Sequence, residues 1–162
     1  MRAEPNPAAV TAGLRAAAST PERTEFVSFA IGEDQYGVDI MSVREIKGWA
    51  DITPLPNQPE YVRGVLNLRG TMVPIIDLRC RFGQGFTEAT SLHVMIIVQV
   101  DDRLVGLLAD RVLDIVAAEG GAIQPVPEIA QTVGARFLSG LMTIEGAMIA
   151  LINLETLATL PS

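Results

Sequence analysis

Cysteine, histidine and lysine are scarce in this 162-residue chain, and each shortage excludes a class of protein. Cys80 and His93 are the only residues of their types, so the sequence cannot form an internal disulfide, a CxxC redox pair or a cysteine–histidine zinc cage. Lys47 is the only lysine, and a formal charge of −7 argues against nucleic-acid binding, which needs clustered lysine and arginine. Every apolar run is far shorter than the roughly 20 residues that cross a bilayer. We therefore expect a protein of a reducing, cytoplasmic setting without direct membrane insertion.

Apolar residues nevertheless make up 49% of the chain, enough to build the core of a domain. Residues 1–24 are rich in alanine, proline, serine and threonine and lack periodic large residues, so we expect a flexible tail there. From residue 25 onward, short apolar runs alternate with glycine, proline, aspartate and asparagine. This pattern is typical of strands, and it predicts a mainly β domain over residues 25–162.

The expected strands are apolar runs that end at a turn signal: Glu25–Ile31, Gln35–Ile40, Gly48–Thr53, Met72–Leu78, His93–Val100, Leu104–Ala109, Leu113–Ala117, Leu141–Ile144 and Met148–Ile152. Helix is expected only in short pieces, near Met41–Ile46, near Pro59–Val62 and after Asn153, a suitable N-cap residue. Tight turns are expected at Arg69-Gly70 and Glu145-Gly146.

The chain also contains an internal duplication. The blocks that align without a gap are Phe26–Ile46 with Met95–Ile115 and Tyr61–Leu78 with Phe137–Leu154. Nearly every apolar position of one block is apolar in its partner, so the repeat units span about residues 26–78 and 95–154. The second unit is longer because of an insertion around Ile129–Arg136.

Each repeat is too short to be stable alone, so we expect both to share one hydrophobic seam. The duplication thus predicts two similar small antiparallel barrels packed side by side. Glycines shared by the repeats mark places where a strand bends or approaches another backbone. Pro74 has no N–H for a ladder and predicts a strand edge or a bulge, whereas its partner Ala150 has no such restriction.

Sequence signatures of catalysis are absent, and we expect no enzyme activity, no cofactor and no metal. Cys80 lies between two arginines, which would lower its pKa and make it reactive, or it is a small filler residue at the end of a strand. His93 opens a strand and is a structural residue or a lone catalytic group. Asp110 and Asp114 would share a face, and so a metal, only if their segment were helical.

The repeats differ most in charge at one turn, where Arg69 aligns with Glu145. Residues 61–86 carry a net charge of +3, from four arginines and one aspartate. An arginine on a rigid turn can bind a carboxylate of an acidic partner, although a solvated arginine without a partner is the alternative. Several aliphatic residues are either a surface patch for a partner or part of the core: Val43, Val94, Met95 and Ile115.

Four segments resemble the CheW family of bacterial chemotaxis coupling proteins: EFVSFAIGEDQYGVDIMSVREI, PEYVRGVLNLRGTMVPIIDLRCRFG, GLLADRVLDI and QPVPE. The resemblance covers roughly residues 25–160, and GVLNLRGTMVPIIDLR is its most specific part. It implies a fold of two five-stranded SH3-like antiparallel barrels. It also implies a non-catalytic adaptor that couples the cytoplasmic tips of methyl-accepting chemoreceptors to the regulatory domain of the histidine kinase CheA. The chain has no room for a kinase or receiver domain, so we expect a stand-alone coupler in the cytoplasm, recruited to receptor arrays.

The resemblance also assigns site residues. The receptor-binding positions are Val43, Glu45, Gly64, Arg69, Val94, Met95, Gly106, Val112 and Ile115. The kinase-binding positions are Ile40 and Ile46 in the first repeat and Ile129 in the second. Arg69 would donate a charge-assisted hydrogen bond to the receptor tip, and the aliphatic residues would receive a receptor helix. Two positions depart from the family, because Met95 stands where valine is common and Ile129 where some members have an aromatic residue.

Two alternative hypotheses remain. The chain is a coupler of the same build for another signalling kinase, or it is a small enzyme that uses Cys80 or His93. Partner binding distinguishes the first alternative, and a Cys80→Ser substitution tests the second.

Overall fold

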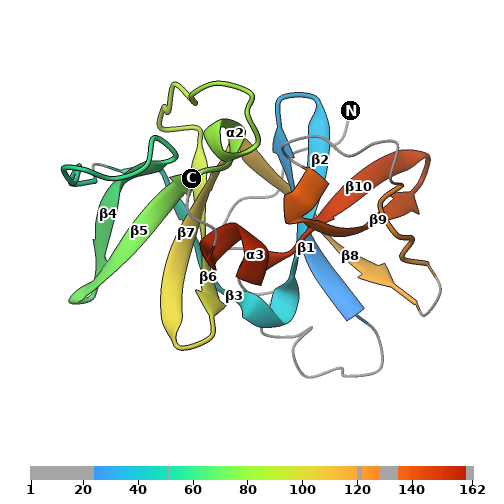
Figure 1. Ribbon diagram of the computed structural model, residues 1–162. Coiled ribbons are helices and arrows are strands. Elements are labelled where there is room, and N and C mark those ends of the chain that lie inside the picture. The colour runs from blue at the N-terminus through green and yellow to red at the C-terminus, as the bar shows by residue number, and fades with distance from the viewer. Residues whose placement is uncertain (1–23, 51, 120–121, 128–134, 160–162) are drawn as a thin grey trace.

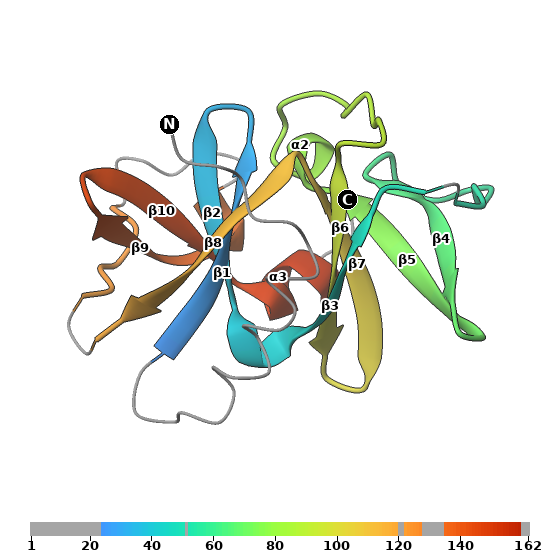
Figure 2. The same ribbon diagram turned by 180° about the vertical axis from the view of Figure 1, so that it is seen from behind.

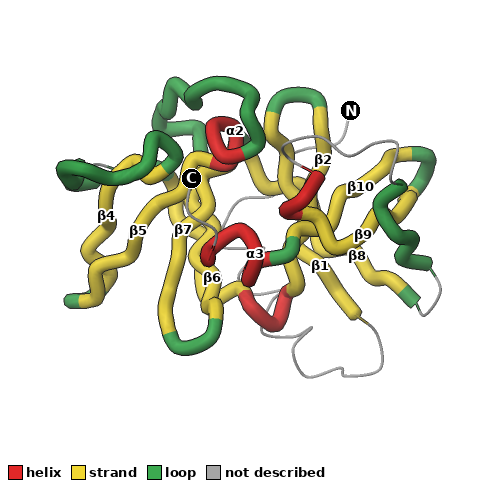
Figure 3. Tube along the Cα trace, viewed as in Figure 1, coloured by secondary structure: helices red, strands yellow, loops and turns green. Residues whose placement is uncertain are grey.

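The computed structural model describes residues 24–50, 52–119, 122–127 and 135–159, and strands dominate it (Figures 1 and 3). The strands are β1 (Thr24–Ile31), β2 (Asp34–Asp39), β3 (Val43–Gly48), β4 (Val62–Leu68), β5 (Thr71–Asp77), β6 (Val94–Val100), β7 (Arg103–Ala109), β8 (Arg111–Ala118), β9 (Leu138–Ile144) and β10 (Ala147–Ile152). The short helices are η1 (Ile40–Ser42), α2 (Leu78–Arg81), η3 (Ala135–Phe137) and α3 (Leu154–Thr159). The expected tail, residues 1–24, lies outside the described residues except for Thr24, which begins β1.

The strands form two five-stranded sheets, which confirms the expected mainly β fold of paired SH3-like barrels. Barrel A has the strand order β8-β1-β2-β10-β9, and barrel B has the order β3-β6-β7-β5-β4. Barrel B lies on the left of Figure 1 and barrel A on the right. The sheets are not wholly antiparallel, because β2 pairs with β10 and β5 with β7 in parallel.

The barrels do not coincide with the sequence repeats. Barrel B is one continuous segment from β3 to β7, and barrel A consists of β1 and β2 before it and β8 to β10 after it. Each barrel therefore contains strands of both repeats. The chain crosses between the barrels twice, at Ile40–Ser42 and at Asp110. These crossings lie at opposite ends of the boundary between the barrels (Figures 1 and 2).

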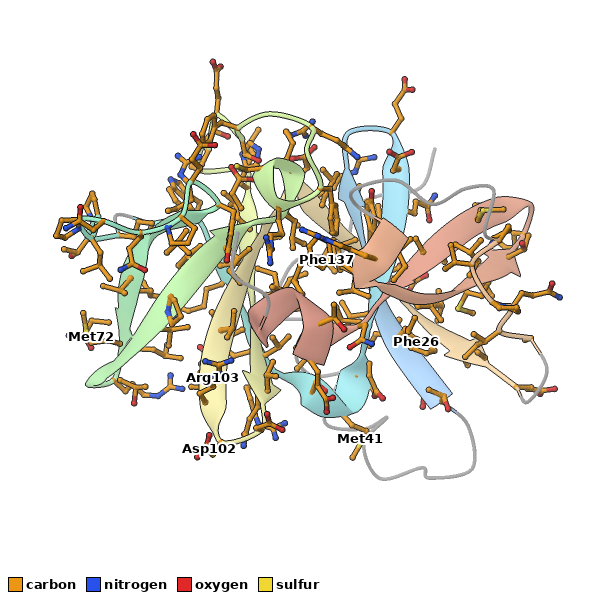
Figure 4. The ribbon with its side chains drawn as sticks, viewed as in Figure 1. Phe26, Met41, Met72, Asp102, Arg103 and Phe137 are labelled. Atoms are coloured by element: carbon orange, nitrogen blue, oxygen red, sulfur yellow. The ribbon has the colours of Figure 1, made fainter. Side chains whose placement is uncertain are left out.

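The largest hydrophobic cluster lies between the barrels, as the expected shared seam requires. Strand β6 shows how this works, because its alternate side chains face different clusters. Ile96 and Val98 belong to the central cluster, whereas Met95 and Ile97 belong to a second cluster inside barrel B. A third cluster, which includes Phe26, fills barrel A (Figure 4). Because the central strands are buried on both faces, neither barrel has a complete core without the other.

The local predictions are wrong in two regions, around β3 and around β4. The helix expected near Met41–Ile46 is only the single turn η1, and the strand expected at Gly48–Thr53 instead occupies Val43–Gly48 as β3. A bulge between Val43 and Glu45 explains the error. The extra residue places buried side chains three positions apart, at Val43 and Ile46, and this spacing imitates a helix.

The second error concerns β4, which the apolar pattern does not predict. A helix is expected near Pro59–Val62, but the chain makes a turn there, with Val62 N donating to Pro59 O at 3.0 Å, and β4 begins at Val62. A bulge between Val62 and Gly64 is followed by three consecutive buried residues, Gly64 to Leu66, and both features interrupt the alternation that would identify the strand.

Other local predictions are confirmed. Asn153 caps α3, because its Oδ1 accepts from Thr156 N at 3.1 Å. Pro74 pairs with β4 only, since the parallel ladder with β7 begins at Ile75. The strand is therefore locally an edge at the position where proline has no N–H to donate.

Candidate docking site

Arg69 lies at the tip of the β4–β5 hairpin and reaches the opposite edge of its own sheet. The turn has φ angles of +50° at Arg69 and +87° at Gly70, values typical of a type I′ turn. Asn67 Oδ1 accepts from Gly70 N at 2.8 Å and fixes the turn. Arg69 Nη2 lies 2.7 Å from Glu45 Oε2 on β3. Because β3 and β4 are the two edges of the sheet, this ion pair connects the edges of barrel B.

The ion pair leaves much of Arg69 accessible. Its side chain is 74% exposed, against 22% for Glu45, and Lys47 Nζ lies 3.6 Å from the other side of the Glu45 carboxylate. The hydrogen bond from Arg69, together with both positive charges, lowers the pKa of Glu45 below its ordinary value. A guanidinium has five N–H donors, so the contact with Glu45 orients Arg69 without using all of them.

The structure thus brings together two predicted site residues, Glu45 and Arg69. Arg69 has a partner within the chain, which neither of the two alternatives for this arginine included.

The predicted aliphatic site residues lie mainly in the interior. Val43, Val94 and Val112 are buried in the central cluster, and Met95 is buried inside barrel B. Of this group Ile115 alone, on β8, is partly exposed. The idea that Val43, Val94 and Met95 form a surface patch is therefore wrong for the free chain, because Val43 faces the central cluster and β6 packs on both faces.

The two predicted glycines allow close packing within the chain. A Cβ on Gly64, whose φ is +146°, would overlap the carbonyl oxygen of Thr53. A Cβ on Gly106 would overlap Cδ1 of Ile75 and lie 3.2 Å from Cδ1 of Ile97. Both glycines are therefore required by the fold.

The predicted kinase-binding residues are only partly placed by the structure. Ile40 lies in η1 and Ile46 in β3, and both side chains are buried in the central cluster. Met41, between them in sequence, is 59% exposed. Ile129 and most of the insertion around Ile129–Arg136 lie outside the described residues.

The arginines of residues 61–86 have partners within the chain, which sequence reasoning missed. Arg63 lies 3.3 Å from the buried carboxylate of Asp77, which also accepts from Thr87 N and Oγ1 at 2.8 and 2.7 Å. The guanidinium carbon of Arg81 lies 4.0 Å from the ring centre of Tyr61 and 4.5 Å from that of Phe137. The sequence signal that could have revealed the Arg81 contacts is the alignment of Tyr61 with Phe137, because each repeat contributes one of these rings to the seam.

Asp110 is the centre of a polar cluster at one of the chain crossings. Its Oδ2 accepts from Gly32 N at 2.7 Å and from Arg79 Nη2 at 2.8 Å, and His93 Nε2 lies 3.5 Å from Oδ1. Burial raises the pKa of Asp110, but the hydrogen bonds and the positive charges outweigh burial and leave the pKa below its ordinary value. The cluster joins both barrels at this crossing.

The structure does not support the reactive or metal-binding roles considered for Cys80 and Asp114, and it gives His93 a hydrogen-bond partner. Burial, with nearby Asp77, raises the pKa of Cys80, so the idea that its neighbouring arginines make it a reactive thiolate is wrong. His93 Nδ1 accepts from Thr90 N at 3.0 Å. Asp114 lies in β8, so the helix that would let it share a metal with Asp110 does not form. Within the described ranges, no group of three or more histidine, cysteine or acidic residues could hold a metal ion.

Two SH3-like barrels on a common core, with a charged hairpin tip at the surface, define the structural class of this chain as a paired-barrel protein. Residues 25–161 match the family model described as a CheW-like domain. The chain therefore belongs to the CheW family, which confirms the resemblance. As a member of this family, the chain is a scaffold protein of chemotaxis signalling.

The relatives agree with this assignment. The chemotaxis protein CheW of Rhizobium meliloti (strain 1021) is 46% identical over 132 residues, covering 82% of this chain and 85% of that protein. The CheW protein of Klebsiella aerogenes is 38% identical over 133 residues, covering 82% and 80%. The crystal structure of the scaffolding protein TtCheW from Thermoanaerobacter tengcongensis has a TM-score of 0.78 and 33% identity, covering 86% of this chain and 90% of that one. Among the described residues, no helix has the length and apolar character to span a membrane.

Proposed function

We propose that this chain is a non-catalytic, cytoplasmic adaptor that couples the cytoplasmic tips of chemoreceptors to the histidine kinase CheA. Membership of the CheW family supports this function. The observation that carries the docking site is the geometry of Arg69, whose guanidinium is oriented by Glu45 while its side chain stays 74% exposed. A preoriented, exposed guanidinium is suited to bind a carboxylate or carbonyl group on another protein.

The receptor site on this proposal centres on the β4–β5 hairpin tip and β3. Arg69 donates to the receptor tip, and Glu45 fixes the guanidinium. Ile115 contacts the apolar face of a receptor helix, because it is the partly exposed aliphatic residue of the predicted set. The other members act from beneath the surface: Val43, Val94, Met95 and Val112 support the strands, and Gly64 and Gly106 allow their close approach.

The kinase site on this proposal uses the region around η1 and β3, and also Ile129. Ile46 lies on β3, which is an edge strand of barrel B and so has one side open to a further strand or barrel. Since Ile40 and Ile46 are buried, they hold the backbone in place, and the neighbouring Met41 supplies accessible apolar surface. The partner surface is the CheW-like regulatory domain of CheA.

Binding measurements with both partners test the proposal. We expect the purified chain to bind a receptor cytoplasmic fragment and the CheA regulatory domain at the same time in analytical ultracentrifugation. Met41→Asp should weaken kinase binding and retain receptor binding, whereas Arg69→Glu should do the reverse. Binding to neither partner would disprove the proposal, and binding to a different histidine kinase alone would favour a coupler for another pathway.

A further inference from the structure

A hollow of about 400 Å³ lies on barrel A where β2 runs beside β10. Its lining includes the exposed side chain of Met148, the largely buried ring of Tyr36, and two carboxylate residues, Glu33 and Asp34. A volume of this size is at the lower end of the range for binding pockets, and suits one or two side chains of a partner. We name it the β2–β10 hollow. None of the receptor-binding or kinase-binding positions discussed above lines it.

The base of the β2–β10 hollow is rigid. Tyr36 stacks between two other aromatic rings, with centroids 6.0 Å from Phe29 and 5.0 Å from Phe82. Tyr36 also faces Ala150 in the parallel register between β2 and β10. A ring held on both sides in this way cannot move to fill the space, so the hollow is a fixed feature of the surface.

Small residues on β10 leave the space open, and the other repeat differs here. Ala147 and Ala150 line the hollow, whereas Thr71 and Pro74 occupy the aligned positions of β5. Met148 is 61% exposed, and its partner in the other repeat, Met72, is 54% exposed at the far end of barrel B (Figure 4). An accessible, flexible thioether beside small residues is a common feature of surfaces that receive apolar side chains.

The charge at the rim also differs between the barrels. Glu33 and Asp34 lie at the β1–β2 turn, and within the described part of the chain neither forms an ion pair. The aligned residues in barrel B are Asp102 and Arg103, and Arg103 Nη2 donates to the Ala158 carbonyl of α3 at 3.3 Å (Figure 4). The turn beside the hollow thus carries two carboxylates that form no ion pair among the described residues, whereas its counterpart, Asp101-Asp102-Arg103, includes a cation.

The backbone beside these carboxylates is also held in position. Gly32 N, one residue before Glu33, donates to Asp110 Oδ2 at 2.7 Å, and Arg79 holds the same carboxylate at 2.8 Å. The turn is therefore attached to the chain crossing at Asp110 rather than free to move. Because the backbone of the turn is held, less entropy is lost when these carboxylates bind an opposite charge.

We propose that the β2–β10 hollow is a further docking surface, which receives a basic amphipathic helix of a partner protein. An apolar side chain of the helix enters beside Met148 and Tyr36, and a lysine or arginine one turn away contacts Glu33 and Asp34. A second copy of this chain is a poor occupant, because its formal charge is also −7. The proposal goes beyond the receptor and kinase sites and does not depend on them.

A designed peptide tests the proposal directly. The probe is a short helical peptide of leucine and lysine, with leucines on one face. Titrated into the ¹⁵N-labelled full chain, it should shift the amide signals of β2 and β10 most strongly. Met148→Lys should weaken binding at least about tenfold, whereas the matched substitution Met72→Lys adds the same charge and should change affinity less than about twofold.

Removing the carboxylates tests the charge contact. The double variant Glu33→Gln, Asp34→Asn should weaken peptide binding at least about tenfold, and its circular dichroism and unfolding midpoint should stay unchanged because both residues are exposed. A peptide of the same composition with alternating leucine and lysine should bind at least about tenfold more weakly.

Three results would overturn the proposal. Equal affinity for both peptides would show that net charge alone causes binding. Signal changes outside β2 and β10 would show that the peptide binds elsewhere. Self-association of the chain that Met148→Lys abolishes would identify a second copy as the occupant.

Discussion

Arg69 and Glu145 occupy the same place in the two hairpins, with the same φ of +50°, and carry opposite charges. The following glycines also match, with φ angles of +87° at Gly70 and +82° at Gly146. The backbone of the turn is therefore common to both barrels, and the side chain alone distinguishes them. In barrel B this side chain pairs with Glu45, whose aligned residue in barrel A is Asp114. The ion pair that connects the edges of barrel B is thus replaced in barrel A by two acidic residues.

Arg69→Glu should weaken binding of a receptor cytoplasmic fragment by roughly 5- to 150-fold, because it removes a charged donor and places a second carboxylate beside Glu45. Isothermal titration calorimetry measures this loss, and the unfolding midpoint should change little because the ion pair is at the surface. The matched control is Glu145→Arg in the twin turn, which should leave receptor affinity intact. Unchanged affinity for a folded Arg69→Glu variant would show that Arg69 does not dock.

Gly64→Ala and Gly106→Ala should both destabilise the chain, and the first should be the more severe. At Gly64 the added methyl group meets backbone atoms of Thr53 and the φ of +146° is strained for alanine, so we expect a loss of about 3 kcal/mol or more. At Gly106 it meets side-chain ends, and we expect about 1–3 kcal/mol. Urea unfolding measures both. Adding Ile75→Val to Gly106→Ala should recover part of the loss, since Cδ1 of Ile75 is removed; no recovery would contradict this account.

Asp110→Asn should lower the unfolding free energy by about 1 kcal/mol at pH 7, because Arg79 and Gly32 lose a charged acceptor that is still partly solvated. The pKa of Asp110 is lowered in the folded chain, so its stabilising contribution is fully present above the unfolded value of about 3.9 and disappears as the pH falls through the lower folded value. Urea titrations should therefore show the difference between wild type and variant closing below about pH 4. A constant difference down to pH 2 would refute this role.

Arg81→Ala should destabilise the chain by about 2–4 kcal/mol, because it removes the group between Tyr61 and Phe137 and leaves a cavity at the seam. Arg81→Leu should cost less than about 1.5 kcal/mol, since Leu157 fills the aligned position of the other repeat and is buried there. Thermal and urea unfolding compare the two variants. Equal losses would mean that the charge of Arg81, rather than its volume, stabilises the seam.

Cys80 should react with iodoacetamide more slowly than a free cysteine at pH 8, because its pKa is raised and less thiolate is present. Mass spectrometry follows the modification. Cys80→Ser should support normal chemotaxis in a strain that lacks the chromosomal copy. Abolished chemotaxis in a normally folded Cys80→Ser variant would revive the hypothesis of an enzyme.

The sequence predicted the repeat, the turns and most strands, because these follow from local apolar alternation and turn chemistry. It did not predict β3 and β4, since a bulge in each strand shifts the alternation. It also could not show which strands share a sheet, because a repeat reports similarity between segments and not their pairing. Barrels A and B emerge from the long-range pairing of β1 with β8 and β2 with β10 in one sheet, and of β3 with β6 and β5 with β7 in the other.

The candidate site was predicted less completely, for a related reason. The difference between Arg69 and Glu145 is visible in the aligned repeats, but the contact of Arg69 with Glu45 joins residues on different strands and needs the closed barrel. Similarly, Val94 and Met95 look like surface candidates in an aliphatic-rich chain, and only the packing of β6 on both faces shows that they are interior. Composition indicates how much apolar material exists, and topology decides which of it reaches the surface.

The chain's two passages between the barrels, Ile40–Ser42 and Asp110, are very short and lie at opposite ends of their boundary. A single long linker would allow one barrel to rotate relative to the other. Two short connections at opposite ends of the boundary oppose that rotation, so we expect the two barrels to move together. Under the proposed coupling function, a signal would then pass through the chain as a change in its position relative to its partners, with little change in its own shape.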